Sequence, residues 1–254
     1  MVTVSVVIPY SPRYTPEPML EEAKRTVAAQ SVPTELVVVD DIDTGPADAR
    51  NAGLDRADTR YVAFLDADDL WAADKLARQL DRLAETGAGL CVQGEPTALD
   101  DFVYDVFVGD HSEVTSAILV DTDRVSARFE TGLQRGEDLL YVLEAASEAG
   151  VCCCPELFTR RHHEDSMMAS GMAVDEYRDH AKRFGYLVSQ RVPEAQPYLP
   201  IYYTQLYTDL GRACHEAGDY DRAVTFLGRA VRISPHPYSV ALLARSVLFA
   251  WLPP

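Results

Sequence analysis

The sequence predicts an α/β fold followed by an all-helical C-terminal extension. Within the first 65 residues, three apolar, β-branched runs alternate with two segments of helical periodicity. Acidic residues directly follow the second and third of these runs, and the pattern becomes wholly helical from about residue 174. An alternation of strands and helices at such short spacing is typical of a sheet covered by helices. We therefore expect an α/β domain over residues 1–170 and a helical extension over residues 171–254.

The three apolar runs predict parallel strands. They span residues 2–8, 35–39 and 61–65. Helices are predicted between them, over about 16–30 and 47–57, and Thr15 offers a hydroxyl that would cap the first one. Strands that are joined by single helices run parallel with right-handed crossovers, so their carboxyl ends meet at one edge of the sheet. Loops at that edge are therefore the expected place for a functional site.

The middle of the chain continues the alternation with less regular spacing. Helices are predicted over 72–85, where leucines share one face, and over 137–149, which Gly150 ends. Apolar stretches that read as strands occupy 90–92, 102–108, 114–120 and 151–158. These stretches would extend the sheet beyond its first three strands.

The extension contains a repeat-like signature. The spacing of Tyr207, Gly211, Ala223 and Pro235 resembles one tetratricopeptide unit of about 34 residues. Because a lone unit cannot bury its own apolar face, it must pack on another part of the chain or on a partner.

The last predicted helix, within residues 239–252, carries an apolar stripe. Four side chains share one side of it: Val240, Leu243, Val247 and Leu248. The single charge in this segment is Arg245, and a stripe of this kind should not face water. We expect it to dock on residues 207–233. Self-association with a second subunit and peripheral contact with a membrane interface are the alternatives.

Composition and charge exclude several classes of partner. The 254 residues include 40 Asp and Glu against 23 Lys and Arg, a formal net charge of −17. Such a surface disfavours nucleic acid and is typical of a salt-loving source or of GC-rich coding. No basic leader precedes the first strand, and no apolar run approaches the ~20 residues of a membrane span. We expect a cytoplasmic protein, peripheral to the inner face of the membrane if it contacts one, with its five cysteines as buried thiols.

Two carboxylates carry the strongest chemical signal. Asp66 and Asp68 directly follow the apolar run 61–65, so a rigid strand holds both. At a spacing of two in an extended chain they would project to the same side. Oxygen ligands of this kind suit Mg²⁺ or Mn²⁺, which take their remaining ligands from water and substrate phosphates. A loop with helix-capping aspartates would give the same triplet, so the motif depends on its context.

Five motifs in a fixed order supply that context. They are Val4-Ser-Val-Val-Ile-Pro9, Glu35-Leu-Val-Val-Val-Asp-Asp41, Ala49-Arg-Asn-Ala-Gly53, Phe64-Leu-Asp-Ala-Asp-Asp-Leu-Trp71 and Arg135-Gly-Glu-Asp-Leu139. Together they resemble the family 2 glycosyltransferases of GT-A fold, in which helices flank a mixed sheet. The resemblance covers roughly residues 2–166 and leaves out the helical extension.

The resemblance implies how a nucleotide-diphosphate sugar would be bound. Pro9 and Asp41 match positions that line the pocket of the nucleotide base, and Arg50 matches a basic position near the nucleotide. Asp66 and Asp68 match the D-x-D motif, in which Mn²⁺ or Mg²⁺ is held against the diphosphate. The divalent cation is therefore the cofactor that the resemblance implies.

The resemblance also implies a base and a closing segment. Asp138 matches the general base, and the segment with Arg161 and His163 is similar to one that closes over the diphosphate. The contribution of the neighbouring His162 stays open.

The expected reaction is a metal-dependent, inverting transfer of a sugar to a hydroxyl acceptor. The expected acceptor is a glycan or a lipid-linked molecule of cell-surface glycan assembly. Two alternatives remain. A nucleotidyltransferase of related fold would normally carry a glycine-rich phosphate loop, and residues 9–16 contain no glycine. A non-catalytic relic could act as an interaction module, although the retained carboxylates argue against it.

Overall fold

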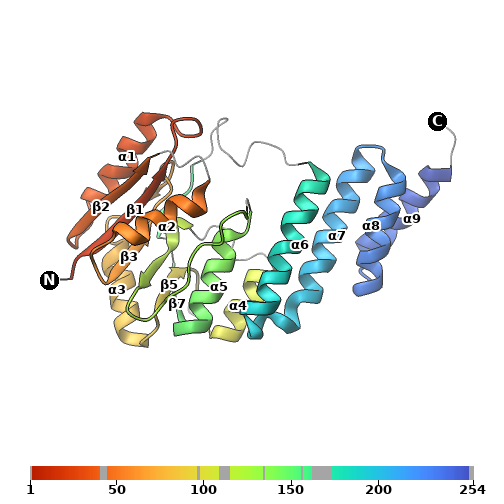
Figure 1. Ribbon diagram of the computed structural model, residues 1–254. Coiled ribbons are helices and arrows are strands. Elements are labelled where there is room, and N and C mark those ends of the chain that lie inside the picture. Colours follow the sequence, from red (N-terminus) through yellow and green to blue (C-terminus); the bar gives the residue numbers. More distant parts are fainter. Residues whose placement is uncertain are drawn as a thin grey trace. The chain divides into compact units, whose positions relative to one another are not determined.

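The computed structural model describes residues 2–40, 45–95, 98–108, 115–133, 135–155, 157–161 and 173–251. The chain forms two compact units, Met1–Gly171 and Met172–Pro254. The first unit contains the strands with their covering helices, and the second consists of helices (Figure 1). Each unit has a hydrophobic core of its own.

A mixed six-stranded sheet forms the centre of the first unit. Its strands are β1 (Val4–Tyr10), β2 (Thr34–Asp40), β3 (Tyr61–Phe64), β5 (Leu90–Gln93), β6 (Leu119–Asp121) and β7 (Val151–Cys154). They lie in the order β2-β1-β3-β6-β5-β7, and β6 runs antiparallel to both of its neighbours. The pairs β1–β2 and β1–β3 are parallel, as predicted, so the carboxyl ends of these strands meet at one edge.

Helices cover this sheet (Figure 1). They are α1 (Glu17–Ala28), α2 (Pro46–Arg56), α3 (Lys75–Thr86), α4 (Leu99–Val108) and α5 (Glu137–Ala149). Helix α2 lies against β1 at very short range, because a Cβ on Gly53 would come within 2.2 Å of Val7 Cγ1. The glycine of the Ala49–Gly53 motif therefore allows the close packing of this helix on the sheet.

A small second sheet lies next to the end of β3. Its strands, β4 (Leu70–Trp71) and β8 (Phe158–Thr159), pair antiparallel. The pairing brings Arg161, which follows β8, beside the turn that follows β3.

The prediction of a strand over 102–108 is wrong. This stretch belongs to α4, and Phe102, Val103, Val106 and Phe107 are its buried residues. Their spacing of one, four and five residues is that of one helical face, so packing outweighs the strand preference of β-branched and aromatic side chains.

Three smaller predictions also need correction. Thr15 does not cap α1, because Pro16 occupies the N-cap position and no side chain caps it. The predicted strand 151–158 divides into β7 and β8, with Pro155 between them. Part of the predicted strand 114–120 is the 3₁₀ helix η1 (Thr115–Ala117).

A buried polar pair, Lys75 and Gln79, lies between α3 and the sheet. The side chain of Lys75 is fully buried, and its Nζ donates to Gln79 Oε1 at 2.6 Å. The ammonium also lies 4.0 Å from the ring centroid of Trp71. Burial lowers the pKa of Lys75 to about 7.

All five cysteines are free and buried, as the sequence predicts.

The second unit is a stack of helices. They are α6 (Val174–Arg191), the 3₁₀ helix η3 (Pro193–Tyr198), α7 (Leu199–Glu216), α8 (Tyr220–Ile233) and α9 (Pro237–Trp251). Helices α7 and α8 approach closely at Gly211, where a Cβ would lie 2.5 Å from Leu227 Cγ. The likeness of this pair to a tetratricopeptide unit stays a prediction.

Helix α9 packs on α8, but through a different face from the one predicted. Of the predicted stripe, Leu243 is partly buried against the core, whereas Val240, Val247 and Leu248 are exposed. The buried positions are Ser239 and Ser246. Across the described residues, no helix combines the length and apolar character that a membrane crossing requires.

Candidate active site

Three aspartates lie in the turn after β3. The N–H of Asp69 donates to the carbonyl oxygen of Asp66 at 3.0 Å and closes the turn. The Ser116 hydroxyl holds it, accepting from the Asp66 N–H at 3.1 Å and donating to Asp69 Oδ2 at 2.5 Å. Because the chain turns here, the extended geometry predicted for Asp66 and Asp68 is wrong, although both carboxylates remain at the carboxyl end of β3.

One buried guanidinium joins this turn to α5. Arg50 on α2 donates to Asp66 Oδ1 at 3.1 Å and to Glu137 Oε1 at 2.9 Å. The side chains of Arg50 and Glu137 are 6% and 9% exposed, and that of Asp66 is 34% exposed. Burial by itself would lower the pKa of Arg50, but Asp66 and Glu137 outweigh it and raise that pKa. Arg50 is therefore held as a cation between two carboxylates.

Asp138 lies in the first turn of α5, next to Glu137. The N-cap of this helix is Gly136, with a φ of 82° that favours glycine. Asp138 Oδ1 accepts from the Leu139 N–H at 2.8 Å, and Oδ2 has a longer contact of 3.4 Å with the Thr115 hydroxyl. Burial and the charge of Glu137 raise the pKa of Asp138 to about 6. Such a carboxylate is mostly ionised at neutral pH and can still take up a proton.

The region carries an excess of negative charge. Partial burial raises the pKa of Asp66 against the opposing effect of Arg50, and burial together with Asp66 raises the pKa of Asp69 to about 7. In the described part of the chain, no three His, Cys, Asp or Glu side chains form a metal-binding group. Mg²⁺ commonly takes one or two carboxylates and completes its shell with substrate phosphates and water. The oxygen donors and the excess of acidic groups therefore fit the divalent cation that the sequence predicts.

Arg161 holds the aspartate turn from the other side. Its Nε donates to the carbonyl oxygen of Asp68, and its N–H donates to Asp69 Oδ1 at 3.2 Å. Its guanidinium also pairs with Glu22 and donates to the Met19 carbonyl at 3.1 Å, both on α1. Arg161 thus couples α1 to the turn. Its predicted role at a diphosphate stays a prediction.

Of the remaining predicted residues, Pro9 lies in the described part of the chain. Pro9 lies near the carboxyl end of β1, and the pairing of Val7 with Phe64 places it at the same edge of the sheet as Asp66. Asp41, His162 and His163 lie outside the described residues.

Sequence reasoning missed three contributors. Glu137 holds Arg50, Ser116 holds the aspartate turn, and Asn51 anchors the segment at Phe129. Asn51 donates to the Phe129 carbonyl at 2.8 Å and accepts from its N–H at 3.0 Å. Glu137 and Asn51 belong to motifs that the sequence singles out, so their importance could have been inferred. Ser116 lies in a stretch without a motif, and only the fold reveals it.

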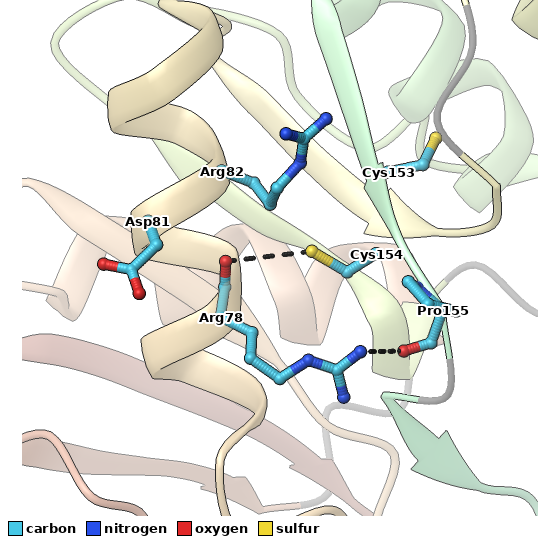
Figure 2. Close-up of a pocket in the computed structure, with 6 residues that line it drawn as sticks. All are labelled: Arg78, Asp81, Arg82, Cys153, Cys154 and Pro155. Atoms are coloured by element: carbon cyan, nitrogen blue, oxygen red, sulfur yellow. Dashed lines mark hydrogen bonds between the residues drawn. The ribbon is translucent and has the colours of Figure 1, made fainter.

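A surface pocket of about 370 Å³ lies between α3 and β7 (Figure 2). Its lining residues are Arg78, Asp81, Arg82, Cys153, Cys154 and Pro155. Arg78 donates to the Pro155 carbonyl at 2.6 Å and so bridges the helix and the strand end. The pocket shares no residue with the acidic site around Arg50, and we assign no substrate to it.

Comparisons with known proteins find glycosyltransferases similar to part of this chain. The family model for glycosyl transferase family 2 matches residues 42–106. TuaG of Bacillus subtilis (strain 168), a glycosyltransferase assigned to teichuronic acid biosynthesis, is 35% identical over 37% of this chain and 50% of its own length. The Escherichia coli UDP-Glc:alpha-D-GlcNAc-diphosphoundecaprenol beta-1,3-glucosyltransferase WfgD is 49% identical over 15% of each chain. The chain thus spans about half the length of TuaG and less of WfgD.

A solved structure gives the same fold. S. aureus TarS, residues 1–349, crystallised with UDP-GlcNAc, superimposes with a TM-score of 0.66 over 98% of this chain and 88% of its own. The two sequences are 15% identical, so this likeness concerns the fold alone. Taken with the mixed sheet, it shows that the α/β unit has the GT-A fold, within which residues 42–106 match glycosyl transferase family 2.

Proposed function

We propose that the chain transfers a sugar from a nucleotide-diphosphate sugar to a hydroxyl of an acceptor, with inversion at the anomeric carbon. The observation that carries this proposal is that a carboxylate able to act as a base lies near a turn whose aspartates could bind a divalent cation. Asp138 supplies the carboxylate, Asp66 and Asp68 lie in the turn, and Arg50 links the two through Glu137.

Asp138 is the proposed general base. The acceptor oxygen attacks the anomeric carbon from the side opposite the leaving diphosphate, and its proton moves to Asp138. Oδ2 suits this task better than Oδ1, because Oδ1 already accepts a short hydrogen bond from the backbone. The raised pKa supports the role, since a base with a pKa near the working pH transfers protons most efficiently. A single base and direct displacement lead to inversion.

Asp66 and Asp68 are the proposed protein ligands of a divalent cation. When bound, Mg²⁺ or Mn²⁺ would neutralise charge that develops on the departing diphosphate. In this proposal Arg50 does not contact the nucleotide. It keeps the Asp66 carboxylate in place, so it is a positioning residue.

The donor pocket is proposed around the edge of the sheet where β1 and β3 end. Pro9 would form part of its wall at the nucleotide base, together with Asp41. Arg161 and His163 would lie on the diphosphate side. These four assignments rest on the sequence resemblance and on the position of Pro9 and Arg161 beside the turn.

The proposed acceptor is a glycan or a lipid-linked molecule of cell-surface glycan assembly, with the protein at the inner face of the membrane. The names of TuaG and WfgD support this choice, because they point to teichuronic acid and to a diphosphoundecaprenol acceptor.

Release of the nucleotide tests the reaction class. The protein is incubated with a panel of nucleotide-diphosphate sugars and Mn²⁺, with and without a chelator. Release of nucleoside diphosphate that the chelator abolishes is the expected result. Release of pyrophosphate would instead identify a nucleotidyltransferase. Absence of turnover with every donor, together with no donor binding, would favour a non-catalytic module.

Two variants test the assigned carboxylates. Asp138→Asn should lower the turnover rate by roughly 10²–10⁴-fold with little change in donor affinity. Asp68→Asn should weaken Mn²⁺ binding, which calorimetry with donor present measures apart from activity. Asp81→Asn, which alters an exposed carboxylate on α3, is the matched control and should change neither. Normal Mn²⁺ affinity in Asp68→Asn would refute the assignment of the ligand.

A further inference from the structure

Helix α9 has an inverted pattern of burial. Its two buried residues are serines, Ser239 and Ser246, which are 1% and 0% exposed. Its largest apolar side chains point outward, with Leu248 59% and Trp251 85% exposed. Hydrophobic burial normally places such side chains inside and serines outside. The inversion leaves the larger apolar side chains of this helix on its outer face.

The inner face of α9 is fully used by its packing on the helical unit. Ser246 Oγ donates to the Leu242 carbonyl at 2.9 Å and lies 2.9 Å from His215 Nδ1. The ring of Phe249 stacks on Tyr220 at a centroid distance of 5.3 Å. Polar and aromatic contacts thus fix the orientation of the helix. Rotating α9 to bury its other side would break them, so the outward apolar side chains belong to the folded state.

The outward side chains form a continuous strip, which we call the apolar face of α9. It consists of Val240, Ala244, Val247, Leu248 and Trp251. At 100° per residue they fall within about a third of the helix circumference. A contiguous apolar face on an otherwise acidic protein marks a contact with another protein or with a membrane.

The charge of this helix favours a membrane over a second copy of the chain. Helix α9 itself carries one charged residue, Arg245, and no Asp or Glu, in a chain whose formal net charge is −17. Arg245 is exposed on α9 itself, and its guanidinium lies 5.6 Å from the Phe249 ring. An acid-free basic segment beside exposed Leu and Trp is the composition of an interfacial membrane helix. A symmetric pair of copies would instead press two positive segments together, which costs free energy.

We propose that the apolar face of α9 inserts into the interfacial layer of a membrane that carries anionic lipids, with Arg245 contacting their headgroups. This inference extends the proposed function by naming the surface that would hold the enzyme near a lipid-linked acceptor. It rests on that function only for its biological setting, because lipid binding needs neither donor nor acceptor.

Vesicle binding tests the proposal with the full chain. Sedimentation with vesicles of phosphatidylcholine, with and without phosphatidylglycerol, measures the partition coefficient. The wild type should bind the anionic vesicles more tightly. The double variant Leu248→Ser/Trp251→Ser should lose at least about tenfold in partitioning, since two apolar side chains leave the lipid. Arg245→Gln should lose about fivefold on anionic vesicles and nothing on neutral ones.

A matched control separates a specific face from general stickiness. Tyr186 on α6 is 61% exposed and lies outside the apolar face, so Tyr186→Ser should bind like the wild type. All these variants change exposed side chains, and circular dichroism checks that each keeps its helix content. Equal binding by the wild type and the double variant would overturn the proposal, as would absence of binding to anionic vesicles.

The failure of this inference can be distinguished from failure of the proposed function. Sedimentation velocity without lipid measures self-association. A wild-type dimer that the double variant converts to a monomer, with no vesicle binding, would assign the face to a second copy and refute the membrane. Nucleoside diphosphate release with a soluble acceptor is unaffected by either outcome and reports on the chemistry alone.

Discussion

Arg50→Met removes the cation that joins the aspartate turn to α5. Methionine replaces the aliphatic part of the side chain, so the change removes the guanidinium with its charge and hydrogen bonds. Wild-type Arg50 donates to Glu137 at 2.9 Å and to Asp66 at 3.1 Å. The variant leaves both carboxylates without this partner. We expect it to destabilise the α/β unit.

The expected size of the loss follows from the burial of the two pairs. The pair with Glu137 has side chains that are 6% and 9% exposed, and breaking a buried pair by removing one partner costs about 3–5 kcal/mol. The pair with Asp66 is more open to water, at 34% exposure, and should add less than about 1 kcal/mol. We therefore expect a decrease of about 3–5 kcal/mol in the free energy of unfolding at pH 8.

Unfolding in urea, followed by Trp71 fluorescence, measures this loss. Trp71 is 5% exposed and reports on the α/β unit, whereas Trp251 is 85% exposed and should change little. Part of the deficit should disappear as the pH falls, because burial raises the pKa of Asp66 and its protonation removes one of the two charges left behind. Arg56→Met alters an exposed arginine of the same helix and should stay within about 0.5 kcal/mol of the wild type.

The alternative outcome is equally informative. If Arg50→Met unfolds like the wild type but binds the donor nucleotide weakly, then Arg50 contacts the nucleotide, as the sequence resemblance implies. The reasoning from the buried ion pairs would then be refuted.

Three further predictions concern a base, a helix contact and a buried amine. Turnover should rise with pH through about 6, the pKa of Asp138, and a turnover that does not change across this range would exclude Asp138 as the base. Asp138→Asn should also raise the free energy of unfolding at pH 8, because it removes a carboxylate whose ionisation is disfavoured by burial. Gly53→Ala should destabilise the fold by roughly 1–3 kcal/mol, since its Cβ would lie 2.2 Å from Val7 Cγ1, and Val7→Ala in the same chain should recover part of the loss in urea unfolding. The free energy of unfolding of the wild type should rise by on the order of 5 kcal/mol between pH 7 and 10.5, because Lys75 binds a proton in the unfolded chain but not in the folded chain over this range. Urea unfolding of Lys75→Met, measured across the same pH range, should not show this rise.

The sequence was most informative where local pattern and chemistry coincide. The first three strands, with the helices between them, follow from β-branched runs and helical spacing, and the observed parallel pairs match them. The mixed sheet and the resemblance to family 2 glycosyltransferases were accessible through motifs that lie at strand ends. Asp66 and Asp138 could be singled out in the same way, because each lies in one of the five ordered motifs, whereas a carboxylate at a strand or helix end is by itself common.

The tertiary structure decided what depends on residues far apart in the chain. The pairing of Arg50 with Glu137 joins positions 87 residues apart, and no local pattern predicts it. The stretch 102–108 became a helix because its packing partners, not its strand-favouring side chains, determine its state. Helix α9 could be predicted from its periodicity, yet its orientation follows from contacts of Ser246 and Phe249 with neighbouring helices. Periodicity states which side chains share a face, but only the neighbours decide which face is buried.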